Sequence, residues 1–197
     1  MNFLAHAWLS FNNPEILVGN MISDFVKGKK QYDFDIAIQK GIKLHRQIDE
    51  YTDKHPATKK ASSIFKPFIG AYAGAFTDVV YDHFLARDTY EFTESSLLLF
   101  TENTYAILQD HEEILPEKFA KMLPYMMQQN WLWNYREIAG IEKSFAGIVR
   151  RAKFLDNSSG AFSCFINHYQ EFKNYYKLFF PDLKNQSSIY YGLLLNE

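Results

Sequence analysis

Apolar residues recur along most of the chain at intervals of three and four positions, the spacing of one face of an α-helix. A wide apolar stripe runs over residues 17–26, directly after Asn13-Pro14-Glu15, a sequence typical of a helix start. The same periodicity marks six further segments, at residues 35–55, 67–87, 94–112, 117–129, 138–155 and 160–179. The pattern therefore predicts seven or eight helices.

Turn-forming residues are scarce, with only 9 Gly and 6 Pro among 197 residues. A sandwich or barrel of short strands needs far more turns than these residues could supply. No internal repeat or flexible linker interrupts the chain. We therefore expect an all-α fold in which residues 1–197 form a single domain.

Charge and composition narrow the class of protein. The chain carries 21 Lys+Arg and 23 Asp+Glu, a net charge of −2, which excludes the strongly basic footprint of a dedicated nucleic-acid-binding protein. The first residues lack the features of a signal peptide, no apolar run is long enough to span a membrane, and the single Cys forms no intrachain disulfide. These features predict a cytoplasmic protein without nucleic-acid or membrane partners, and leave its oligomeric state unknown.

Polar residues with metal-binding chemistry interrupt the apolar pattern within the first 83 residues. They fall into four groups: His6; Asn20 and Asp24; His45, Asp49 and Asp53; and Asp78, Asp82 and His83. Residues four apart lie on one face of a helix, so neighbouring side chains within a group can act together. Taken singly, each group has an ordinary structural explanation, such as a buried core histidine or a surface His/Asp pair.

Together, these groups indicate a metal site, because side chains from different helices can converge on one ion in an all-α protein. Mixed His and Asp ligands without Cys suit Mn²⁺, Fe²⁺, Mg²⁺ or Zn²⁺, and the excess of carboxylates favours Mn²⁺ or Mg²⁺. Small basic groups could be solvated helix ends or could dock an acidic partner. They comprise Lys27, Lys29, Lys30, Arg150, Arg151 and Lys153.

The order and spacing of the motifs at residues 1–6, 19–28, 41–56 and 78–85 resemble the acyl carrier protein phosphodiesterase family. The resemblance implies a helical fold related to the HD-domain metal phosphohydrolases. It also implies a hydrolase that removes the 4′-phosphopantetheine group from holo acyl carrier protein, its partner and substrate, with Mn²⁺ as the usual activator and Mg²⁺ or another divalent metal as alternatives.

Under this resemblance, the polar groups receive roles. The expected metal ligands, or groups that orient a metal-bound water, are His6, Asp24, His45, Asp49, Asp78 and Asp82. Asp24 is also a candidate catalytic group, and His83 a candidate proton donor for the serine alkoxide that leaves. Arg46 is expected to steady the phosphate as a fixed cation.

Two other functions fit the residues. One is an HD-like phosphohydrolase that acts on a nucleotide or another small phosphoester. The other is a non-enzymatic helical interaction module, in which the His and Asp side chains form a buried structural network.

Overall fold

The computed structural model describes residues 1–196, which form eleven α-helices, four 3₁₀ segments and no strand. The helices are α1 (Phe3–Trp8), α2 (Pro14–Ile22), α3 (Ile36–Lys54), α4 (Pro56–Ile69), α5 (Ala73–Ala86), α6 (Glu94–Asp110), α7 (Glu117–Gln128), α8 (Trp131–Asn134), α9 (Ile138–Arg151), α10 (Ser159–Asn167) and α11 (Tyr169–Leu195). The predicted all-α class is confirmed, although the helices outnumber the seven or eight expected.

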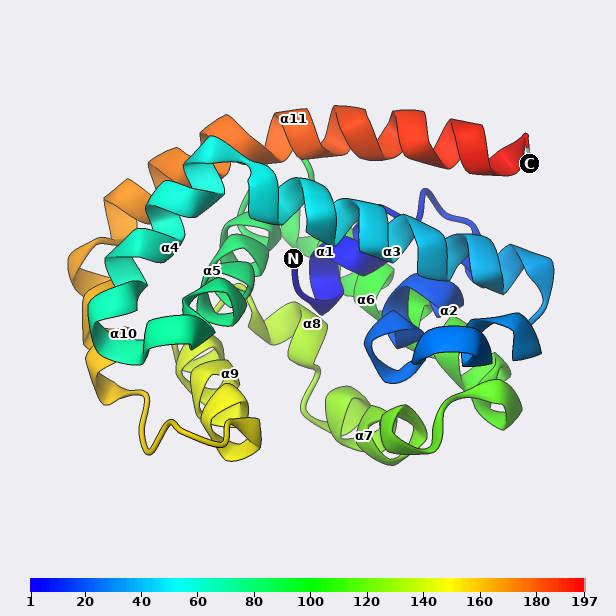
Figure 1. The fold of residues 1–197 in the computed structure, drawn as a ribbon, viewed down its shortest axis with the longest axis horizontal. Helices are drawn as coiled ribbons and strands as arrows, with labels where there is room; N and C mark the ends of the chain where they lie inside the picture. Colours follow the sequence, from blue (N-terminus) through cyan, green and yellow to red (C-terminus); the bar gives the residue numbers. More distant parts are fainter. Residues whose placement is uncertain (197) are drawn as a thin grey trace.

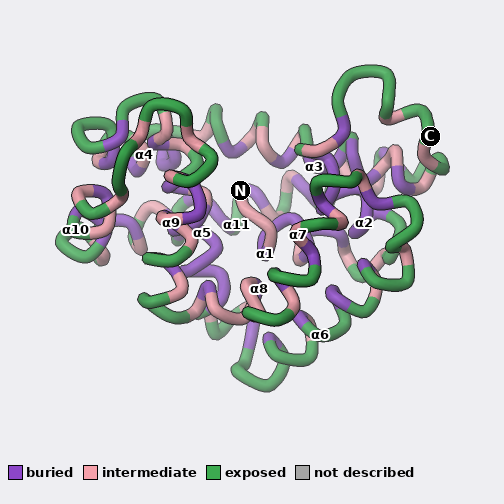
Figure 2. The backbone as a smooth tube through the Cα atoms, turned by 90° about the horizontal axis from the view of Figure 1, so that it is seen from below, coloured by how far each residue is buried: buried purple, intermediate pink, exposed green. Residues whose placement is uncertain are grey.

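The long helix α11 runs along one edge of the molecule and packs against α3 and α4 (Figure 1). Helices α7, α8 and α9 lie on the opposite side, and α1 and α5 pass through the middle. Buried backbone concentrates in α2, α3 and α5 (Figure 2). The amino-terminal segment, with α1, lies between these elements at the centre of the fold. Within the described residues, no helix combines the length and apolar character needed to cross a membrane.

Proline positions account for the main differences from the predicted helices. Pro56 ends α3 but also begins α4, because proline fits the first turn of a helix, where His55 accepts the Ala57 N–H at 3.2 Å. Pro67, expected to precede a helix, lies inside α4, and α11 continues through Pro181 to Leu195. Tertiary packing of these amphipathic helices outweighs the local cost of a proline.

Two glycines let α2 and α3 approach until their backbones touch. A Cβ on Gly19 would lie 2.1 Å from the carbonyl oxygen of Ile38, and a Cβ on Gly41 would lie 2.3 Å from the carbonyl oxygen of Ile16. No larger residue fits at either position without moving a helix. The contact places Asn20, next to Gly19, against α3.

Helix α1 receives its amino-terminal cap from a distant helix. Asp82, fully buried in α5, accepts the backbone N–H of Leu4 at 2.7 Å and those of Asn2 and Ala5 at 3.3 Å. The side chain of Asn2, at the cap position of α1 itself, makes no such bond. Because a buried helix start needs acceptors for its free N–H groups, Asp82 fixes α1 on α5 and thereby the position of His6.

Candidate functional site

Two imidazole rings and one carboxylate meet where α1 and α3 come together. The rings of His6 and His45 stack with centroids 3.8 Å apart and planes 13° apart. Asp49 lies against both, with Oδ1 3.1 Å from His6 Nε2 and Oδ2 3.1 Å from His45 Nε2. One ligand atom from each of these residues lies within 4.8 Å of the others, a spacing that a single metal ion could bridge.

Two further predicted carboxylates flank this group. Asp24 Oδ1 lies 3.3 Å from His45 Nε2, with a side chain that is 72% exposed. The α-ammonium group of Met1 lies 3.2 Å from both Asp49 and Asp78, so it joins Asp78 to the cluster. The structure thus brings together five of the six predicted ligand residues, four directly and Asp78 through the ammonium group.

The position of Asp24 depends on a change of helix type. The predicted stripe over residues 17–26 reads as one helix, but α2 ends at Ile22 and a 3₁₀ turn, η1 (Ser23–Phe25), follows. The tighter turn leaves Asp24 at the solvent-facing side of the cluster, while the buried His6 and His45 form its inner side.

Asn20 orients both histidines, a role that the sequence did not indicate. Its side-chain Oδ1 accepts the Nδ1–H of His6 at 2.8 Å, and its backbone oxygen accepts the Nδ1–H of His45 at 2.7 Å. Its Nδ2 donates to the His6 carbonyl at 2.8 Å and to Ser10 Oγ at 3.1 Å, which fixes the orientation of the amide. The only sequence signal was an amide next to a glycine, four positions before Asp24.

These hydrogen bonds determine what the histidines present to Asp49. With Nδ1–H donating to Asn20, a neutral ring carries a lone pair on Nε2, and both Nε2 atoms face the carboxylate. His45 Nε2 is buried and faces the carboxylate oxygens of both Asp49 and Asp24. Lone pairs directed at a carboxylate repel it unless a proton or a metal ion lies between them. The donor set therefore fits a divalent cation.

The pKa values of the three residues reflect the same close contact of the imidazoles with the carboxylate. Burial disfavours the charged form of His45, but the hydrogen bonds and charges of Asp24 and Asp49 outweigh it and raise the pKa of His45 to about 9. Burial and the neighbouring charge of His45 lower the pKa of His6 to about 4. Burial opposes ionisation of Asp49, yet the Met1 ammonium and both imidazoles hold its pKa well below the usual value. The stacked rings therefore carry one proton between them, since two imidazolium ions at this distance repel.

Three residues with predicted roles lie outside the cluster. His83 is buried, with Nδ1–H donating to the Tyr135 carbonyl at 2.7 Å and Nε2 accepting the Tyr169 hydroxyl at 2.9 Å. Arg46 is exposed and donates to Gln31 at 2.7 Å. Asp82 caps α1 as described above. Asp78 and Asp82 lie on one face of α5 and meet different atoms of the amino-terminal segment, whereas His83 is directed to Tyr135 and Tyr169.

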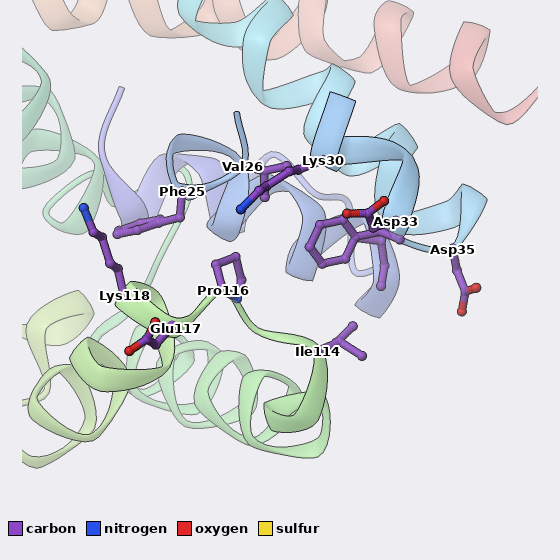
Figure 3. A pocket seen from close by; sticks show the side chains of 11 residues that line it. Phe25, Val26, Lys30, Asp33, Asp35, Ile114, Pro116, Glu117 and Lys118 are labelled. Atoms are coloured by element: carbon purple, nitrogen blue, oxygen red, sulfur yellow. The ribbon is translucent and has the colours of Figure 1, made fainter. Parts of the chain in front are cut away.

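Two cavities adjoin the cluster region and share one residue. The first, of about 590 Å³, is lined by Met1, Asp24 and Asp78 of the cluster. The second, of about 540 Å³, lies between Val26 and Pro116, and no residue of the cluster lines it (Figure 3). Phe25 lines both cavities and so stands between them. The cluster is therefore accessible from the first cavity.

Replacement of Asp82 by Ala is expected to lower the free energy of unfolding by about 2–4 kcal/mol, because it leaves buried backbone N–H groups at the start of α1 without an acceptor. Urea unfolding monitored by circular dichroism measures the change. Asp110→Ala, at the exposed end of α6, is the matched control and should stay within about 0.5 kcal/mol of the parent protein. Equal unfolding midpoints for both variants would contradict the capping role.

Comparisons with known proteins identify the family of this chain. The family model described as acyl carrier protein phosphodiesterase matches residues 1–183. A Photorhabdus laumondii protein named acyl carrier protein phosphodiesterase is 32% identical over 182 residues, which cover 92% of each chain. Relatives of the same name from Yersinia enterocolitica and Escherichia coli are each 31% identical over 95% of this chain, covering 97% and 98% of their own lengths. No solved structure matches the chain. The chain therefore belongs to the acyl carrier protein phosphodiesterase family.

Proposed function

We propose that this protein is a metal-dependent phosphodiesterase that hydrolyses the 4′-phosphopantetheine group from holo acyl carrier protein. The names of its relatives support the reaction and the substrate. One structural observation carries the proposal: Asn20 holds two stacked imidazoles so that both Nε2 atoms face Asp49. With one proton shared between the two rings, one Nε2 lone pair still faces the carboxylate, an arrangement that a purely structural network would not favour.

We propose that the metal is held by His6, His45 and Asp49, with Asp24 and Asp78 beside them. Imidazole and carboxylate ligands suit Mn²⁺, and Mg²⁺ is the alternative that a carboxylate-rich site favours. When bound, such a cation lowers the pKa of a coordinated water and polarises a phosphoryl oxygen.

The protein's own groups would position the reactants. The hydrogen bond with His45 lowers the pKa of Asp24, so its exposed carboxylate is ionised and can orient an attacking water by accepting a hydrogen bond from it. The Met1 ammonium and the interactions with both imidazoles keep Asp49 ionised, which preserves its capacity as a ligand. We assign His83 a positioning role, since it holds the Tyr135 backbone, and we assign Asp82 the role of placing α1.

We further propose that residues 1–197 act as one domain of the HD type. The family match over residues 1–183 and the single cluster of buried apolar side chains that extends from α1 to α11 support one domain. The arrangement of His and Asp ligands on separate helices around one point supports the relation to HD phosphohydrolases.

Incubation of holo acyl carrier protein with the purified protein and Mn²⁺ is expected to yield apo carrier protein, detected by mass spectrometry as loss of the prosthetic group. Addition of EDTA should abolish the conversion. A panel of nucleotides and small phosphoesters is tested in parallel. Hydrolysis of one of these compounds, with the carrier protein unchanged, would indicate the rival phosphohydrolase function. An unchanged carrier mass, together with no Mn²⁺-induced rise in melting temperature, would instead indicate a non-enzymatic module.

A further inference from the structure

Helix α9 forms a cationic wall of the 590 Å³ cavity. Lys143, Arg150 and Arg151 of this helix line the same space as Met1 and Asp78 of the acid–imidazole cluster. In Figure 2, α9 lies to one side of the amino-terminal segment and α7 to the other. A ligand in this cavity would therefore contact the cluster and the cationic wall at the same time.

The two arginines converge without a counterion. Their guanidinium nitrogens lie 3.6 Å and 3.9 Å from the position that a Cβ on Gly147 would occupy, so both side chains fold back over this glycine. Neither forms an ion pair with a carboxylate of residues 1–196, whereas Arg136 pairs with Glu94 at 3.0 Å. Two like charges brought together repel, and a bound anion converts that repulsion into attraction.

Arg151 also acts close to the amino-terminal segment. Arg151 and Tyr135 line the same cavity. The Tyr135 hydroxyl accepts a hydrogen bond from Asn2 Nδ2 at 3.0 Å. Asn2 follows Met1, whose ammonium group contacts Asp49 and Asp78. The cationic wall and the cluster are thus on the same cavity, with Tyr135, Asn2 and Met1 between them.

The rest of the cavity suits an uncharged chain. Apolar side chains from five elements of the fold line it, namely Phe3, Phe25, Val79, Met122 and Trp131. A volume of about 590 Å³ is within the range of small-molecule sites in proteins, roughly 300–1,000 Å³. The cavity therefore combines a cationic side with a largely apolar surface.

We propose that Arg150 and Arg151 form a phosphate-binding subsite, in which their guanidinium groups hold the phosphate oxygens of the phosphopantetheine arm while the arm lies along the apolar surface. The identity of the arm rests on the proposed function, whereas the phosphate subsite rests on the arrangement of α9. Guanidinium groups suit this task because their paired N–H donors match the spacing of phosphate oxygens.

Binding to the metal-free protein tests the subsite without any hydrolysis. Isothermal titration calorimetry in EDTA compares free 4′-phosphopantetheine with pantetheine, which lacks only the phosphate. The parent protein should bind 4′-phosphopantetheine about 10–100-fold more tightly, and Arg150→Ala/Arg151→Ala should bring this ratio close to one, as expected for loss of charge-assisted hydrogen bonds. Lys153→Ala is the matched control, because Lys153 lies just beyond α9, over the Phe154 ring, and does not line this cavity.

Equal binding of the two ligands by the parent protein, or no binding of 4′-phosphopantetheine, would overturn the inference. So would an arginine variant that keeps the parent ratio while its melting temperature is unchanged. If the variant loses affinity for holo carrier protein alone, the arginines contact the carrier surface, which also contradicts a phosphate subsite. A phosphate preference without conversion of holo carrier protein would refute the proposed function and leave the subsite intact.

Discussion

Replacement of Asp49 by Asn is expected to reduce kcat/KM for holo carrier protein by more than about 100-fold. Loss of a group that only orients a metal ligand costs roughly 10–100-fold, so a larger loss indicates that Asp49 is itself a ligand. Among residues 1–196, Asp49 is the single carboxylate in contact with both imidazoles and with the Met1 ammonium. Asparagine keeps the shape of the side chain but removes the negative charge and one of the two acceptor oxygens. One of the two imidazoles would then face the amide nitrogen of asparagine instead of a carboxylate oxygen.

Calorimetric titration with Mn²⁺ should show a parallel loss of affinity in Asp49→Asn, which separates a ligand role from a role in substrate binding. Glu50→Gln is the matched control, since Glu50 follows Asp49 on α3 but is exposed and pairs only with Lys54 at the surface. This control should retain Mn²⁺ binding and turnover. If Asp49→Asn bound Mn²⁺ as tightly as the control, the assignment of His6, His45 and Asp49 as the metal site would be wrong.

The second large effect is expected from Gly19→Ala, which should lower the free energy of unfolding by about 3 kcal/mol or more. This loss is at or above the largest values that are typical when a side chain is added to a well-packed core. The added methyl group would lie 2.1 Å from the Ile38 carbonyl oxygen and 2.9 Å from the Cα of Gly41. Backbone atoms on both sides cannot rotate away, so α2 has to move from α3. That movement displaces Asn20 and with it the hydrogen bonds to both histidines.

Chemical unfolding should therefore show an earlier midpoint for Gly19→Ala, and Mn²⁺ binding should weaken in the protein that remains folded. Gly192→Ala is the control, because a Cβ on Gly192 meets no atom within 4 Å. Alanine there should raise stability by up to about 1 kcal/mol, since it favours the helical conformation of α11. Equal midpoints for the two variants would show that the α2–α3 contact can relax, contrary to the geometry.

The substitution at Asp49 tests the chemistry of the metal ligands, whereas the substitution at Gly19 tests the helix packing that positions them. Asp49 supplies charge at the centre, whereas Gly19 supplies only the absence of a side chain where two helices meet. Both should weaken metal binding, but Asp49→Asn should do so without the large stability loss expected for Gly19→Ala. The comparison separates the chemistry of the ligands from the packing that brings them together.

Local patterning determined the fold class and part of the site. Spacing of three and four residues is a property of each helix by itself, so it predicted α3, α6 and α7 closely. The step of four between His45 and Asp49 likewise placed two ligands on one face of α3. His6 and Asp24 could be named as candidates by residue type and resemblance, although their distance from His45 could not be derived.

Contacts between distant segments decided the rest. Asp82 and His83 carry the same chemistry as the cluster residues, yet one caps α1 and the other bonds to Tyr135 and Tyr169, because of where α5 lies among its neighbours. The role of Asn20 depends on the close approach of α2 and α3. Sequence spacing fixes the direction of a side chain relative to its own helix, but only the packing of helices against one another fixes which group that side chain meets.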